Sequence, residues 1–229
     1  ALQSAKELSE LGVRIIIGPV FNSNLIYLNE LKDITFLSLT NKNKNYSKNI
    51  INAGINATSQ LKAIDKFIKK NEIKNTIFLI PDGDYKEEIK GAISYSKIKI
   101  LKNYYYNTDP TKLTNQIEKI TDYKRRKQNL EDEIKRLENL DEDKNERLIE
   151  KLKKRDTLGS VKFDSVIIAD FDESLKSVTT SLLYTDISPM DKYFITLNQW
   201  FDESLLKEIS SQPMYFPSIN KENYEKFSE

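Results

Sequence analysis

Cysteine and histidine are absent from this chain of 229 residues. The chain therefore has no thiol nucleophile, no disulfide and no zinc site built on these side chains. It also lacks the imidazole of histidine, the commonest general base of enzymes. The sequence also contains no G-x-S-x-G, G-x-x-x-x-G-K-[ST] or G-x-G-x-x-G motif. It therefore offers neither a nucleophile elbow nor a phosphate-binding loop. We expect a protein that is not an enzyme and that holds no cofactor and no metal ion.

An excess of one charge and long apolar runs are missing as well. Lys and Arg total 36 and Asp and Glu total 35, a formal net charge of +1. Such a chain has no overall field that would attract nucleic acid or an anionic membrane. No stretch approaches the roughly 20 apolar residues of a transmembrane helix. With 38% hydrophobic and 31% charged residues, the composition predicts a globular protein with a charged surface.

Short apolar segments alternate with amphipathic segments along most of the chain. The apolar segments predict strands over residues 13–17, 34–39, 76–80, 98–106, 163–169, 193–197 and 214–216. The amphipathic segments predict helices over residues 1–11, 25–31, 56–71, 85–96, 173–184, 202–210 and 220–227, and a further helix that Asp109-Pro110 begins. Strands that alternate with helices are typical of βαβ units and a parallel sheet. The fold class is therefore α/β.

The strand pattern disappears between Thr114 and Arg155. The apolar residues here fall on two helical stripes: Leu130, Ile134 and Leu137 on the first, Leu148 and Leu152 on the second. This pattern predicts an antiparallel helical hairpin with both signs of charge on its surface, anchored at its base through Ile117 and Ile120. Two interpretations stay open. The hairpin is an arm that docks a partner, or it is a solvated hairpin closed on its own narrow stripe, the commoner case for balanced charges.

Polar and aromatic side chains follow several of the predicted strands. In parallel sheets, ligands bind beyond the carboxyl ends of the strands. The candidates for a ligand cleft are Asn22, Ser23, Ser38, Thr40, Asn41, Asp82, Asp84, Tyr85, Asp170, Phe171 and Trp200. The amides and hydroxyls suit a carboxylate, the acidic residues suit an ammonium group, and the aromatic rings could cover that group. Each residue taken alone is also an ordinary helix cap or turn residue, and a weak alternative is an oxygen-ligand metal site at Asp82 and Asp84.

The residues also resemble a known superfamily. GVRIIIGP (12–19), FLSLTN (36–41) and IPDGDY (80–85) resemble strands of type 1 periplasmic binding proteins, such as the binders of leucine, isoleucine and valine. TDYKRR (121–126), KRDTLG (154–159) and FDSVII (163–168) are similar to the penicillin-binding-protein activator family of bacterial lipoproteins. The sequence FNSN (21–24) departs from the Ser-Ser/Thr-Gly pattern with which amino-acid binders hold a carboxylate.

The resemblance implies two Rossmann-like lobes with parallel sheets. Residues 1–72 would form part of lobe 1, whose strands are missing at both ends. Residues 73–229 would form lobe 2, with the hairpin inserted at about 122–156. The cleft residues would face a groove between the lobes.

The resemblance also implies a function and a location. The implied protein is periplasmic, docks onto a peptidoglycan synthase, and is anchored to the outer membrane by lipid through a segment upstream of Ala1. The alternative is the solute-binding component of an ABC transporter for branched-chain or other amino acids.

Overall fold

The computed structural model describes residues 1–42, 47–83, 85–197, 207–218 and 226. The chain divides into two compact units. Unit 1 comprises residues 1–65 and 87–97, and unit 2 comprises residues 66–86 and 98–229. The predicted helices at 202–210 and 220–227 lie largely outside the described residues. No helix in the described part of the chain is both long and apolar enough to cross a bilayer.

Unit 1 contains a parallel sheet of three strands in the order β1-β2-β3. These strands span Ile15–Ile17, Thr35–Ser38 and Ile50–Asn52. Helix α1 (Leu2–Glu10) and the 3-10 helix η1 (Asn22–Leu28) supply Ala5, Leu25 and Leu28 to a small core with Phe36 and Ile50. The helix expected over 25–31 is therefore a 3-10 helix that begins earlier. Strand β3 was not predicted.

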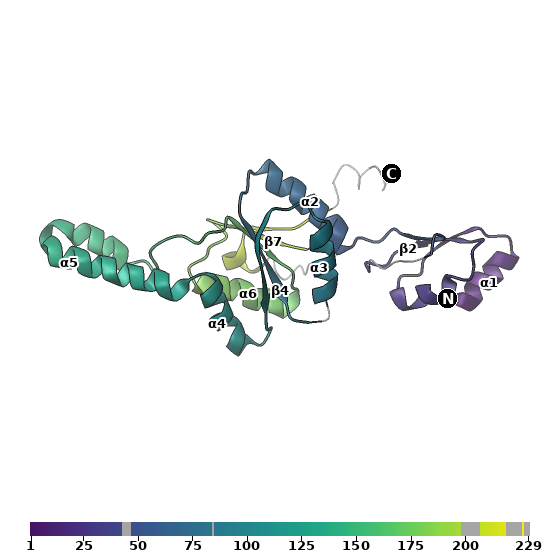
Figure 1. Cartoon of the computed structure of the whole chain (residues 1–229), viewed down its shortest axis with the longest axis horizontal. Helices are drawn as coiled ribbons and strands as arrows, with labels where there is room; N and C mark the ends of the chain where they lie inside the picture. The colour runs from purple at the N-terminus through teal and green to yellow at the C-terminus, as the bar shows by residue number, and fades with distance from the viewer. Residues whose placement is uncertain (43–46, 84, 198–206, 219–225, 227–229) are drawn as a thin grey trace. The chain divides into compact units, whose positions relative to one another are not determined.

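Unit 2 contains the larger sheet, five parallel strands in the order β5-β4-β6-β7-β8 (Figure 1). The strands are β4 (Thr76–Pro81), β5 (Ile100–Tyr106), β6 (Ser165–Ile168), β7 (Tyr193–Thr196) and β8 (Met214–Tyr215). Every residue of β4 and β6 is buried. Central strands of a parallel sheet are covered on both faces, so they appear in the sequence as unbroken apolar runs.

Helices connect these strands and complete the cores. They are α2 (Ala57–Lys70), α3 (Lys86–Tyr95), α4 (Pro110–Ile120) and α6 (Asp172–Tyr184). Leu113 and Ile117 of α4 and Leu175, Val178 and Leu182 of α6 belong to the main core of unit 2. The strand and helix alternation confirms the predicted α/β class.

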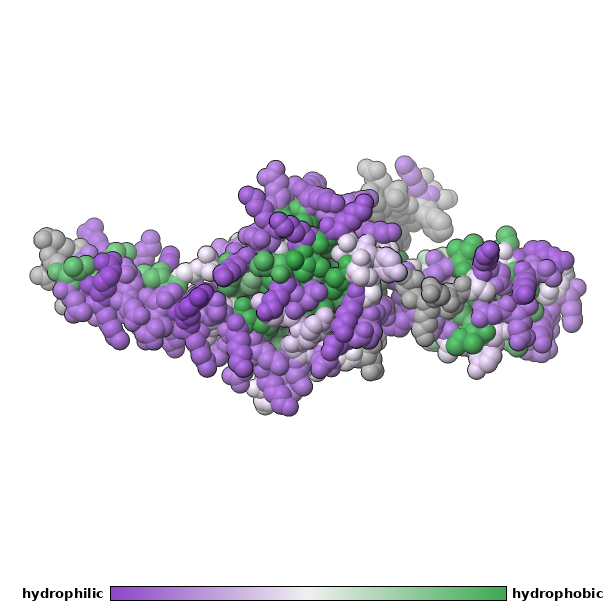
Figure 2. Space-filling view, viewed as in Figure 1, coloured by the Kyte–Doolittle hydropathy of each residue, from purple (hydrophilic) through white to green (hydrophobic). Residues whose placement is uncertain are grey.

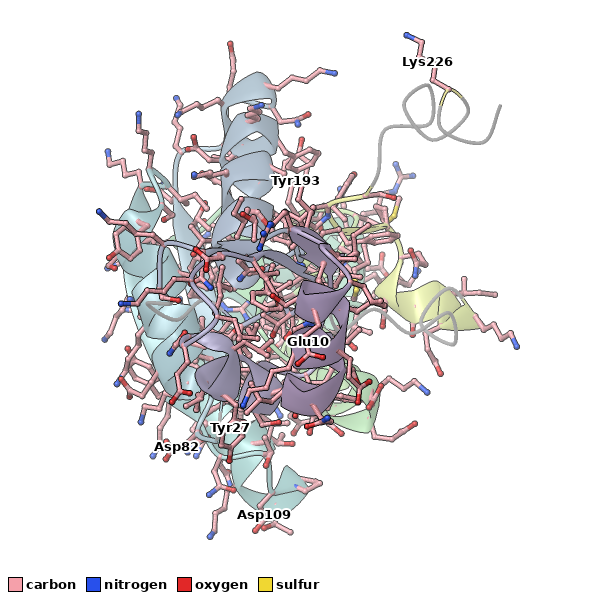
Figure 3. The ribbon with its side chains drawn as sticks, turned by 90° about the vertical axis from the view of Figure 1, so that its right-hand side faces the viewer. Glu10, Tyr27, Asp82, Asp109, Tyr193 and Lys226 are labelled. Carbon is pink, nitrogen blue, oxygen red and sulfur yellow. The ribbon has the colours of Figure 1, made fainter. Side chains whose placement is uncertain are left out.

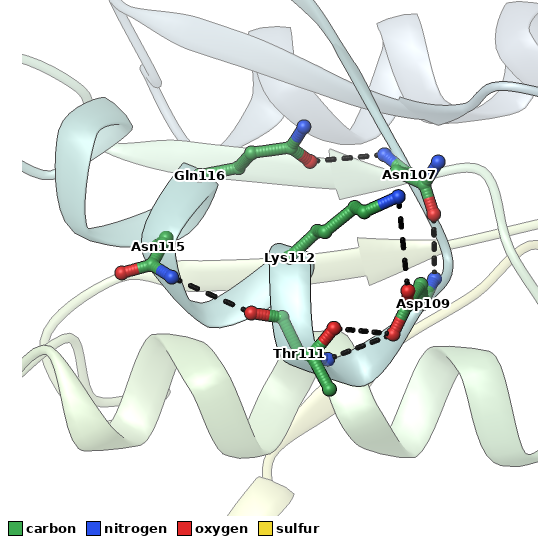
Figure 4. Close-up of polar contacts among 6 residues, drawn as sticks. All are labelled: Asn107, Asp109, Thr111, Lys112, Asn115 and Gln116. Carbon is green, nitrogen blue, oxygen red and sulfur yellow. Dashed lines mark hydrogen bonds and ion pairs between the residues drawn. The ribbon is translucent and has the colours of Figure 1, made fainter.

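Helix α4 begins at the cap that the sequence predicts (Figure 4). Asp109 Oδ1 accepts hydrogen bonds from the Thr111 backbone N–H at 3.0 Å and from the Thr111 hydroxyl at 2.8 Å. These hydrogen bonds hold the pKa of Asp109 below its usual value. Pro110 occupies the first helical position, where no backbone N–H is needed. The cap fixes where the chain turns back after β5.

Helix α5 (Tyr123–Lys153) folds back on itself between Glu138 and Asn145 (Figure 1). The Lys153 ammonium lies 3.0 Å from the Glu138 carboxylate, whereas a straight helix would separate these residues by about 22 Å. We call this hairpin the arm. Leu130, Leu137, Ile149 and Leu152 form its core, with Ile134 and Leu158 packed against them. The expected contact of Leu148 is wrong, because that side chain is 45% exposed and Ile149 takes its place.

A buried arginine joins the base of the arm to the rest of unit 2. Arg126 is only 4% exposed. Its Nε donates to the Thr121 carbonyl and its Nη1 to the Thr157 hydroxyl, each at 2.9 Å, and its Nη2 donates to the Thr185 carbonyl. The sequence analysis assigned this anchoring to Ile117 and Ile120, which do lie in or against the core, but it missed Arg126.

The buried hydrogen bonds of Arg126 predict that two adjacent arginines differ strongly in how much they stabilise the fold. Arg126→Ala leaves two buried carbonyls and a hydroxyl without their donor, so the free energy of unfolding should fall by at least about 2 kcal/mol. Arg125 is exposed and its ion pair with Asp122 lies at the surface, so Arg125→Ala should cost under about 1 kcal/mol. Urea denaturation of both variants measures this. Equal losses would contradict the assigned role of Arg126.

Candidate functional site

The carboxyl-end edge of the unit 2 sheet gathers several of the predicted cleft residues. Asp82 follows β4, and its backbone N–H donates to the carbonyl of Tyr106, the last residue of β5, at 2.8 Å. Figure 3 shows Asp82 and Asp109 on one side of unit 2 and Tyr193, the first residue of β7, toward the other. The residues after β4, β5 and β6 therefore share the edge at which ligands of parallel sheets bind.

Two aromatic rings meet at this edge. The Tyr85 and Phe171 ring centroids lie 5.7 Å apart, and the rings are nearly perpendicular at 88°. This edge-to-face arrangement is favourable because the positive edge of one ring points to the negative face of the other. Both side chains are half-buried. The pair thus presents part of each ring at the surface, where it can cover an apolar or cationic group.

Asp170 directly precedes Phe171 in the chain and is only 3% exposed. The Tyr106 hydroxyl donates to its Oδ2 at 2.5 Å, and the Phe171 backbone N–H donates to its Oδ1 at 2.9 Å. Burial raises the pKa of Asp170, the two hydrogen bonds lower it in part, and nearby Asp172 adds to the rise. Burial raises the pKa of Tyr106, and the charge of Asp170 and the hydrogen bond to it add to the rise. In this arrangement Asp170 holds the turn that places Phe171.

An ion pair lies at the same edge. Lys86 Nζ is 2.7 Å from Asp82 Oδ1 and 4.8 Å from the centre of the Tyr105 ring. Asp82 is exposed, and its carboxylate pairs with the Lys86 ammonium at the surface. In the part of the chain that the structure describes, no three acidic side chains come together as a metal site would require. Asp84 and Trp200 lie outside the described residues.

The predicted residues of unit 1 divide into two groups. Ser38 and Thr40 are buried, and their hydroxyls form hydrogen bonds within the loops of unit 1. The Ser38 hydroxyl donates to the Pro19 carbonyl at 3.0 Å, and Thr40 Oγ1 accepts from the Lys42 N–H at 3.2 Å. Ser23 and Asn41 are exposed, and Asn22 is half-buried as the first residue of η1. That these residues share a groove with Tyr85 and Asp170 stays a prediction, because it concerns both units.

Tyr106 belongs to this edge of the sheet through its hydrogen bond to Asp170, but the sequence analysis did not identify it. It ends a run of three tyrosines, of which Tyr104 and Tyr105 are more exposed. A buried tyrosine needs a partner for its hydroxyl. The position of Tyr106 at the end of a strand was the only available signal.

The raised pKa of Asp170 predicts a pH-dependent stability. An acid whose pKa is higher in the folded state stabilises the fold while protonated, and this contribution is lost as the pH rises above about 4, the unfolded value, through the folded pKa. Asp170→Asn keeps an oxygen that accepts from the Phe171 N–H and places an amide N–H, which can donate to the Tyr106 hydroxyl oxygen, where the carboxylate accepted, but it does not titrate. The wild-type chain should therefore lose stability relative to this variant as the pH rises above about 4. Urea denaturation at several pH values measures the difference, and a difference that does not change with pH would contradict the prediction.

Comparison with known proteins identifies the fold. No family model matches the chain, and no curated protein matches it. Full-length LpoA from Haemophilus influenzae superimposes with a TM-score of 0.54 at 10% identity, over 89% of this chain and 31% of that one. A periplasmic ligand-binding protein of a branched-chain amino acid ABC transporter from Burkholderia xenovorans gives 0.50 at 11% identity, over 85% and 46%.

This chain spans less than half the length of either structure. At such identities the likeness concerns the fold alone. The chain has an α/β fold with parallel sheets that matches type 1 periplasmic binding proteins.

Proposed function

We propose that this chain is part of a periplasmic, non-enzymatic binding protein that docks onto a peptidoglycan synthase and stimulates it. The observation that carries the proposal is the arm, a helical hairpin inserted between α4 and β6. The sequence resemblance to the penicillin-binding-protein activator family supports it, and so does the fold likeness to LpoA. A periplasmic location and a lipid anchor upstream of Ala1 belong to the same proposal.

The arm has the properties of a docking element. Its surface is mostly hydrophilic, with a few apolar residues among the charges (Figure 2). Leu140 and Leu148 are 65% and 45% exposed. Exposed apolar side chains within a field of both charge signs suit a protein partner, because the charges set the orientation and the apolar contacts supply affinity. Arg126 fixes the base, so little flexibility is lost on binding.

Shortening the arm tests this proposal. Replacing residues 131–148 by a short Gly-Ser turn keeps Arg126, Leu130, Ile149 and Leu152, so unit 2 should stay folded. Binding to a peptidoglycan synthase ectodomain, measured by surface plasmon resonance, should weaken at least tenfold, since the contact residues are gone.

A milder variant guards against misfolding. Leu140→Ser combined with Leu148→Ser should also weaken binding, whereas Leu11→Ser, which removes an exposed apolar side chain of unit 1, should not. Wild-type affinity in a folded arm-shortened chain would refute docking through the arm.

The alternative function is solute binding for an ABC transporter of amino acids. The Tyr85–Phe171 ring pair supports it, because two half-buried rings can cover the ammonium group of a ligand. This function needs no arm.

Calorimetric titration with a panel of amino acids tests the alternative. If a member binds in the micromolar range, Tyr85→Ala should weaken it roughly tenfold through loss of ring contacts. Tyr184→Ala removes an exposed ring elsewhere in unit 2 and should leave binding unchanged. No heat with any amino acid would count against solute binding.

A further inference from the structure

A cavity of about 470 Å³ lies at the base of the arm. Three segments line it: the first turn of α5 through Arg126, the return segment 154–161, and the loop 186–192 after α6. It lies at the amino-end edge of the unit 2 sheet, opposite the edge that carries Tyr85 and Phe171, because the return segment leads into the start of β6. Its volume is in the range of sites for small molecules. Neither proposed function uses it.

The Arg126 guanidinium is the buried charge of this cavity. Three of its N–H groups donate to Thr121, Thr157 and Thr185, none of them to a carboxylate. A guanidinium has further N–H donors beyond these. Among the described residues no acidic side chain forms an ion pair with it. Burial lowers the pKa of Arg126, with nearby Asp186 and Asp122 acting in the opposite direction. A buried positive charge without a paired anion is unfavourable, and an anion in contact with it would relieve this cost.

The remaining charges of the lining differ in their exposure. Lys154, Arg155 and Lys192 add to Arg126, so four cationic residues face three carboxylates. One carboxylate, Asp186, accepts a hydrogen bond at 2.5 Å from the Thr157 hydroxyl, which in turn accepts one from Arg126. All three carboxylates are exposed, as are Lys154 and Arg155, so water screens these charges, whereas Lys192 is half-buried and Arg126 is buried. The buried part of the cavity is therefore positive.

We infer that this cavity binds a small oxyanion, a phosphate- or carboxylate-bearing solute, whose oxygens contact Arg126 and the rim residues Arg155 and Lys192. Such a ligand would touch the arm, its return segment and the loop after α6 at once. It would thus tie the arm more firmly to the sheet. The site is independent of the Tyr85–Phe171 edge and of what the arm docks.

The test uses the whole chain and two probes, inorganic phosphate and citrate. Calorimetry at constant ionic strength, with chloride as the exchanged anion, should give saturable binding of at least one probe with a Kd below about 1 mM. The two probes distinguish phosphate from carboxylate chemistry. Hydrogen exchange of residues 154–161 and 186–192 should slow on binding, because the ligand contacts both segments.

Charge-matched variants decide whether the binding belongs to the cavity. Arg155→Gln with Lys192→Gln should weaken binding roughly tenfold, since charge-assisted hydrogen bonds are lost. Lys62→Gln with Lys70→Gln removes the same charge from exposed positions of α2 and should leave it unchanged. The inference is overturned if neither probe saturates, or if both double variants bind like the wild-type chain.

Discussion

The burial of the central parallel strands on both faces is the constraint on which unit 2 depends. Strands β4 and β6 expose no residue, and their hydrogen bonds are satisfied by neighbouring strands. Polar chemistry can therefore stand only at the two ends of the strands. The carboxyl ends carry Asp82 and the Tyr85–Phe171 pair. The amino ends carry the arm and the cavity at its base. One sheet thus presents two chemically different edges.

Buried polar groups hold each edge in place. At the carboxyl end, Asp170 connects Tyr106 of β5 to the turn after β6 through two hydrogen bonds. At the amino end, Arg126 connects the arm to the segments on either side of it. The arm has a small core, and a helical hairpin of this kind is marginal without tertiary contacts. The arm therefore depends on the hydrogen bonds of Arg126 to stay a rigid element.

The apolar pattern was sufficient to predict most of the fold. Strands β4 and β6 are recognisable because complete burial requires unbroken apolar residues, and the arm is recognisable because its stripes replace the strand pattern. Strand β3 escaped because only Ile50 and Ile51 mark it within polar surroundings. The second stripe of the arm was assigned to Leu148 instead of Ile149 because the rotation of the returning helix is set by the turn, which the pattern does not specify.

The candidate sites were less accessible to sequence reasoning. Tyr106 and Asp170 are 64 residues apart, and only the strand order places them together. Arg126 stands in a run of charged residues and has no distinguishing neighbour in the sequence. Asp82, Tyr85 and Phe171 could be proposed because each follows a strand, but their orientation depends on the turns. Local pattern thus identifies the edge, and tertiary contacts decide which side chains face it.

Hydrogen exchange of the whole chain with and without a peptidoglycan synthase ectodomain tests the central claim most directly. The claim is that the amino-end arm is the surface for a protein partner and that the carboxyl-end edge is separate. The account predicts that the synthase slows exchange within residues 127–151 and leaves residues 82–86 and 170–172 unchanged. Protection of the carboxyl-end residues with an unprotected arm would contradict it.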